Sequence, residues 1–352
     1  MARQDFENKL GDGDKSVVQF EAERRSFVGR LQHFLHSYPT VVPVFILFAS
    51  LVGFGLVVGG KFFHPFNVSL IMQQVSIIGV LAAAQAIIIL TAGIDLSVGA
   101  IMTLVAVLMG TLAVQMGVDA PLALLFGFCI GVFCGALNGF LITRFKLPPF
   151  IVTLGTWSIF LATNRLISGS QSIRSQDIDA AAPMLKWFGE GFLVLGAKIT
   201  YGSVLMFAVF AVLWYVLNKT AWGRHVYAVG DDVEAAELSG IRTNRQLVWV
   251  YVLAGAICAI AAWSSIGRVG SVSPNAFAEA NLQSITAVVI GGISLFGGRG
   301  SILGPLFGTL IVGVFEAGLR QAGLDVQWQV FTIGWLIIIA VAIDQWIRKV
   351  SA

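Results

Sequence analysis

Residues 247–267 read LVWVYVLAGAICAIAAWSSIG and contain no charged side chain. A helix needs about 20 mostly apolar residues to cross the hydrocarbon core of a bilayer, so this run is long enough to span one. It follows the polar stretch Thr220–Gln246, which is bordered on its other side by a second apolar run, residues 201–218. The pattern predicts two membrane helices joined by a loop that lies in water.

The composition predicts the same class for the whole chain. Of its 352 residues, 57% are hydrophobic and 12% are charged, and the mean hydropathy is +0.85. A soluble domain has about 25% charged residues. Because no strand-like alternation separates the apolar runs, we expect an all-α integral membrane protein and not a barrel. Ten runs are long enough for spans: 40–59, 70–91, 97–116, 121–142, 149–168, 201–218, 247–267, 281–296, 301–319 and 328–347.

The distribution of basic residues predicts the orientation. If residues 1–38 form a cytoplasmic tail and residues 39–348 cross the membrane ten times, 15 of the 22 Lys and Arg residues lie inside and seven lie outside. Loops rich in Lys and Arg remain on the cytoplasmic side of the membrane. We therefore expect both termini and the loop 220–246 in the cytoplasm, with residues 169–200 as the longest outer loop.

The loop 220–246 carries the signals of a short helix. Asp231 and Glu234 have capping-box spacing, in which the first side chain accepts from freed N–H groups of the first turn. Ala235 and Ala236 are strong helix formers, and Gly240 can take the left-handed conformation that ends a helix. A helix of two turns is unstable alone, so we expect it to lie against another surface.

Small residues indicate how the spans pack. Gly131, Gly135 and Gly139 recur at intervals of four, which places them on one face of the fourth predicted span. Such small-xxx-small faces let helix backbones approach closely in lipid. We expect this face to contact another helix of the bundle.

Two glycine-rich segments interrupt the apolar pattern. Residues 91–99 read TAGIDLSVG and residues 291–300 read GGISLFGGRG, and both contain Gly-Ile-x-Leu. Broken helices at matching positions in two halves of a chain are typical of transporters. The first segment contains Asp95, which is either a functional acid at membrane depth or a capping residue for the third span.

Several classes of function lack their sequence signals. Gly55–Lys61 matches the phosphate-binding pattern G-x-x-x-x-G-K, but Phe62 replaces the Ser or Thr that holds magnesium. The spacing of His and Cys predicts no metal site, no catalytic cluster is present, and no basic run suits nucleic acid. We expect a chain that is not itself an enzyme, so any energy for transport must come from a partner.

Four segments together carry a family resemblance: GIDLSVG (93–99), LPPFIVTLGT (147–156), the stretch from TAWGR (220–224) to AAELSGI (235–241), and GGISLFGG (291–298). The chain resembles permease subunits of bacterial ATP-binding-cassette sugar importers of the ribose, xylose and fructose class. The wider family also includes branched-chain amino-acid permeases. The resemblance covers about residues 40–347.

The resemblance implies a multi-pass protein of the bacterial inner membrane that forms a homodimeric or pseudo-dimeric pore. It also implies two cytoplasmic ATPase subunits, which bind ATP and magnesium, and a periplasmic sugar-binding protein on the outer face. No cofactor is expected on this chain. The ATPase would dock on the coupling loop, for which we predict these residues: Gly223, Arg224, Gly230, Asp231, Glu234, Ala235, Ala236, Gly240 and Ile241.

Polar residues within the spans are candidates to line a translocation pathway: Gln73, Gln74, Gln85, Asp95, Asn138, Asn281 and Gln283. Each can instead form hydrogen bonds between helices. The expected cargo is a monosaccharide of the fructose or ribose class; xylose and branched-chain amino acids are alternatives. A secondary carrier driven by an ion gradient is a further alternative, and it would require ionisable groups such as Asp95 and Glu316.

Overall fold

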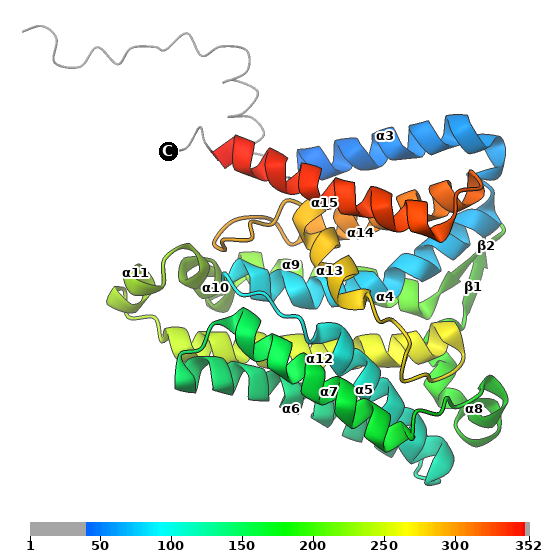
Figure 1. The fold of residues 1–352 in the computed structure, drawn as a ribbon, viewed down its shortest axis with the longest axis horizontal. Coiled ribbons are helices and arrows are strands. Elements are labelled where there is room, and N and C mark those ends of the chain that lie inside the picture. Colours follow the sequence, from blue (N-terminus) through cyan, green and yellow to red (C-terminus); the bar gives the residue numbers. More distant parts are fainter. Residues whose placement is uncertain (1–39, 349–352) are drawn as a thin grey trace, which may run out of the picture.

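The computed structural model describes residues 40–348, which form an almost entirely helical bundle (Figure 1). The predicted tail, residues 1–38, lies outside the described part. Within that part, eight helices are long and apolar enough to span a membrane. They are α3 (Val41–Val58, continued by η1, Gly59–Lys61), α4 (Pro65–Leu90), α5 (Val98–Gly110, continued by the π-helix η2, Thr111–Gln115), α6 (Ala120–Phe145), α7 (Pro149–Ser168), α9 (Tyr201–Lys219), α12 (Thr243–Val269) and α14 (Leu303–Gln321).

The eighth predicted span, residues 281–296, differs in the structure. Its helix, α13 (Ala280–Ile290), has 11 residues and measures about 16 Å at 1.5 Å per residue, which is too short to cross a bilayer. Gly270, with φ 74°, ends α12, and the helix resumes only at Ala280. The tenth predicted span corresponds to α15 (Val326–Arg348), which has 23 residues.

The predicted glycine face of the fourth span packs against α12. A Cβ atom at Gly135 would lie 2.1 Å from the carbonyl oxygen of Tyr251, and one at Gly131 would lie 2.8 Å from that of Gly255. A Cβ atom at Gly139 would lie 3.0 Å from the Cα atom of Val248. The absence of side chains therefore sets the separation of α6 and α12, as the sequence predicted.

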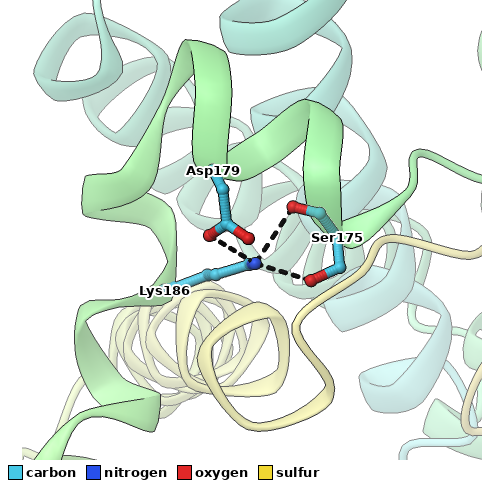
Figure 2. A network of polar contacts seen from close by, with 3 residues as sticks. All are labelled: Ser175, Asp179 and Lys186. Atoms are coloured by element: carbon cyan, nitrogen blue, oxygen red, sulfur yellow. Dashed lines mark hydrogen bonds and ion pairs between the residues drawn. The ribbon is translucent and has the colours of Figure 1, made fainter.

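A compact segment closes one end of the bundle. It contains α8 (Ser175–Ala181), the 3-10 helix η3 (Pro183–Gly189) and an antiparallel hairpin of β1 (Gly191–Val194) and β2 (Ala197–Thr200), which the sequence did not predict. Figure 2 shows Lys186 joining η3 to α8: its Nζ lies 2.6 Å from Asp179 Oδ1 and donates to the carbonyl oxygen and Oγ of Ser175. The ring of Trp187 stacks on that of Tyr201 at 5.0 Å, which is consistent with an aromatic belt at a membrane interface.

The two ends of the bundle differ in what they carry. In Figure 1 the hairpin and α8 lie at one end, and two short helices, α10 (Ala221–Asp231) and α11 (Val233–Leu238), lie at the other. α9 runs between these ends, from Tyr201 directly after β2 to Lys219 just before α10. α4 lies in the middle of the bundle and is buried from Val75 to Leu90.

The contact between α6 and α12 makes a prediction about stability. Gly135→Val should lower the melting temperature of the detergent-solubilised protein, because overpacking typically costs about 1–3 kcal/mol. Gly155→Val is the matched control, since nothing lies within 4 Å of a Cβ atom built at this position in α7. An unchanged melting temperature for Gly135→Val would contradict the close approach of the two helices.

Candidate functional site

The loop 220–246 folds as two helices, where the sequence predicted one. Thr220 begins α10, because its Oγ1 accepts from the N–H of Gly223 at 3.2 Å. The cap of α11 is Asp232 and not the predicted Asp231: Asp232 Oδ1 accepts from the N–H of Ala235 at 3.0 Å. Asp231 belongs to α10, whereas Asp232 has the extended backbone that a capping residue requires.

The end of α11 follows the prediction for Gly240. This residue has φ 83°, and its N–H donates to the carbonyl oxygen of Glu237 at 2.9 Å. The N–H of Ile241 donates to the carbonyl oxygen of Ala236 at 3.0 Å. These two bonds form a Schellman motif, which satisfies carbonyl groups at the end of the helix.

The predicted coupling residues do not share one face. Arg224, Asp231, Glu234, Ala235 and Gly240 are exposed, Ile241 is half-buried, and Gly223, Gly230 and Ala236 are buried. Leu238, which is not among the predicted coupling residues, is 91% exposed at the end of α11, and Val233 is 44% exposed. The sequence contained a signal for both residues, because each is an apolar residue that directly follows an acidic residue in a polar loop.

The end of α10 lies against both glycine-rich segments. The N–H of Gly298 donates to the carbonyl oxygen of Leu90 at 3.0 Å, so the second segment binds the last residue of α4. A Cβ atom at Gly230 would lie 1.8 Å from that same oxygen and 2.6 Å from Gly298 N. A Cβ atom at Gly297 would lie 2.7 Å from Ala92 N. We call Leu90, Ala92, Gly230, Gly297 and Gly298 the glycine junction.

A side-chain bond reinforces the junction. Tyr227 Oη on α10 donates to the carbonyl oxygen of Gly300 at 3.0 Å. Burial raises the pKa of Tyr227, so the hydroxyl keeps its proton and remains a donor at neutral pH. α10 is therefore attached to the turn between α13 and α14 through backbone packing and one hydrogen bond.

Asp95 is buried inside the protein. Its side chain is 1% exposed, and its Oδ1 accepts from both the N–H and the Oγ of Ser97 at 2.6 Å. Asn138 Nδ2 donates to Ser97 Oγ at 2.8 Å. The amide of Gln85, in the orientation that satisfies both groups, donates to the Asp95 carbonyl oxygen at 3.1 Å and accepts from its N–H at 3.2 Å.

Asn281 extends this network to α13. Its Oδ1 accepts from the N–H of Gly99 at 2.5 Å, and its Nδ2 donates to the carbonyl oxygen of Leu96. Four predicted pathway residues, Gln85, Asp95, Asn138 and Asn281, thus hold the turn between α4 and α5 in place. Their contacts favour the structural alternative for each of them.

A polar cavity of about 470 Å³ lies between α4, α12, α13 and α14, and Gln74, Gln283 and Glu316 line it. Gln73 points elsewhere: its Nε2 donates to Ser69 Oγ at 2.9 Å, and Ser69 Oγ donates to the carbonyl oxygen of Lys198. Of the two adjacent glutamines on α4, Gln74 lines this cavity and Gln73 does not. Arg268 and Glu279, which are not among the predicted pathway residues, also line the cavity.

Residues 67–341 match the family model described as "Branched-chain amino acid transport system / permease component". The chain belongs to this permease family. Two members are the fructose import permease protein of Rhizobium meliloti, 57% identical over 99% of this chain and 97% of the relative, and the ribose import permease protein of Bacillus subtilis, 38% identical over 95% and 98%. A galactose/methyl galactoside import permease protein of Haemophilus influenzae is 32% identical over 85% of this chain and 93% of the relative. No solved structure matches the permease.

The Asp95 network makes a prediction that separates its two possible roles. Asp95→Ala leaves the N–H and hydroxyl of Ser97 without their buried acceptor, which should cost about 1–3 kcal/mol and lower the melting temperature. Asp95→Asn retains an acceptor oxygen and should lose less. A normal melting temperature for both variants, with uptake abolished in each, would instead show that the charge itself serves transport.

The glycine junction makes a second prediction. Gly230→Ala should abolish uptake, because its Cβ atom has no space beside Leu90 and Gly298 and must push α10 away from the two segments. Gly53→Ala on α3, where nothing lies within 4 Å of the added atom, is the control. Membrane abundance is measured for both variants, and full uptake by Gly230→Ala would refute the tight junction.

Proposed function

We propose that the protein is the permease subunit of an ATP-binding-cassette importer that carries a monosaccharide into the cytoplasm, with fructose the first substrate to test. The observation that carries this proposal is the 57% identity to a fructose import permease protein over 99% of the chain. Relatives named for ribose and galactose import support the sugar class. The family description also names branched-chain amino acids, which makes leucine the necessary comparison.

The short helices supply the surface on which a partner ATPase would dock. α10 and α11 project from one end of the bundle (Figure 1), and the helix cap and Schellman motif make α11 a rigid unit. The exposed Leu238 side chain offers an apolar anchor to a cleft in the partner. ATP and magnesium belong to that partner, and this chain contributes the surface that the partner pushes.

The orientation and the remaining partners follow from this docking. α10 and α11 lie in the cytoplasm, as do both termini, and the hairpin end faces the periplasm. A sugar-binding protein docks at the hairpin end and delivers the sugar. A second copy of the chain completes the pore, since one chain carries one coupling surface.

Uptake in cells tests the proposal directly. A strain that lacks this permease, complemented with the wild-type gene, should accumulate labelled fructose, and unlabelled fructose should compete better than ribose, xylose or leucine. Depletion of cellular ATP should stop uptake while a proton gradient is maintained. Uptake that continues on the proton gradient alone would indicate a secondary carrier.

The docking surface makes a separate prediction. Leu238→Asp should reduce the amount of ATPase that co-purifies with the permease, because it places a charge in an apolar contact. Leu195→Asp is the matched control: Leu195 is 94% exposed in the hairpin turn at the opposite end. Equal ATPase recovery with the two variants would exclude α11 as the docking helix.

A further inference from the structure

The polar cavity lies in the half of the bundle that contains the hairpin. At a rise of 1.5 Å per residue, Gln74 lies about 14 Å along α4 from its first residue, Pro65. Glu316 lies about 8 Å along α14 from its last residue, Gln321. Ser69 on α4 donates to Lys198 of β2, which fixes that end of α4 at the hairpin. The cavity therefore lies nearer to the hairpin end of the bundle than the glycine junction does.

Non-helical backbone borders the cavity between α12 and α13. Residues 277–279 line it and lie outside any helix, directly before the short helix α13. Irregular backbone within a membrane bundle occurs where it is buried in protein or lines a cavity that contains water. In transporters, such interrupted helices form substrate sites.

Three side chains from three helices meet in this cavity. Gln283 Nε2 on α13 donates to Glu316 Oε1 on α14 at 3.2 Å, and Gln74 Nε2 on α4 donates to Glu316 Oε2. Each carboxylate oxygen thus holds one amide in a defined direction. The glutamine side chains keep further donor and acceptor capacity, which is the combination that a sugar hydroxyl requires.

The charges around the cavity are balanced. Glu279 and Glu316 supply two negative charges, and Arg268 and Arg320 supply two positive ones. A lining with no net formal charge suits a neutral solute that binds through hydrogen bonds. Its volume of about 470 Å³ lies within the range of small-molecule pockets, about 300–1,000 Å³.

We propose that this cavity is the first sugar-binding site within the permease, where Gln74, Gln283 and Glu316 bind the hydroxyl groups of a neutral monosaccharide. The inference rests on the proposed function, because it assumes a sugar cargo delivered at the hairpin end. The coupling of Glu316 to both glutamines means that a sugar displaces or shares these bonds as it passes.

Adjacent glutamines on α4 provide a matched test of access. Gln74→Cys and Gln283→Cys should react with a membrane-impermeant methanethiosulfonate reagent added outside the cells, because both positions line the cavity. Gln73→Cys should react much more slowly, since the Gln73 side chain points towards Ser69. The wild-type chain contains three cysteines, so its labelling is measured as the background. Equal labelling at positions 73, 74 and 283, or none at 74 and 283, would overturn the assignment of the cavity whatever the cargo is.

Uptake of fructose and of its deoxy analogues tests the hydrogen bonds. Gln74→Ala and Gln283→Ala should raise KM by roughly 2- to 10-fold, which corresponds to one hydrogen bond, and Gln73→Ala should not. Gln74→Ala and Gln283→Ala should also change the ratio of uptake between fructose and one deoxy analogue. The binding protein is the same in every strain, so a changed ratio reports on the permease. Equal losses for all analogues would mean a structural role and would refute the site. Absence of uptake by the wild type of fructose and of every other monosaccharide tested would instead reject the proposed function, while the labelling result would stand.

Discussion

The close packing of backbone at the glycine junction is the constraint on which the rest of the structure depends. Gly230 at the end of α10 lies against the carbonyl oxygen of Leu90, and Gly298 donates a hydrogen bond to that same oxygen. Side chains at these glycines would push apart the end of α4, the end of α10 and the second glycine-rich segment. Because protein interiors are close-packed, a displacement of α10 must be taken up by its neighbours and not absorbed in empty space.

The junction is part of a series of contacting elements that runs from α11 at one end of the bundle to the polar cavity. α11 follows α10 after the single residue Asp232, and α10 contacts the turn from α4 to α5 and the turn from α13 to α14. α4, α13 and α14 then continue to the polar cavity, where Gln74, Gln283 and Glu316 meet. Both broken regions of the chain therefore lie between the proposed site of force and the proposed site of cargo.

Much of this arrangement could be predicted from sequence because lipid imposes simple rules. The length of apolar runs located the helices, and the spacing of Gly131, Gly135 and Gly139 identified a packing face that meets α12. Asp95 shows the limit: its position suggested an acid at membrane depth or a helix cap, but not the buried network with Ser97, Asn138 and Gln85. Those partners come from distant parts of the chain.

The cavity and the coupling helices show the same limit. Whether Gln73 or Gln74 faces the cavity depends on the rotation of α4 in the bundle, which helix packing fixes and local sequence does not. The cap shifted from Asp231 to Asp232 because Asp231 is the last residue of α10, a helix that the sequence did not predict. The 11-residue length of α13 was likewise hidden in an apolar run that continues through Gly291 and Gly292.

If the glycine junction is rigid, α10 and the second glycine-rich segment move as one unit. Spin labels at the exposed positions His225 and Arg299 report the distance between α10 and this segment by electron paramagnetic resonance, in the permease assembled with its ATPase. A third label at Leu195 reports the hairpin end. We expect the distance from His225 to Arg299 to stay constant when ATP binds, while the distance from each to Leu195 changes. A change between His225 and Arg299 with the bundle otherwise fixed would contradict it.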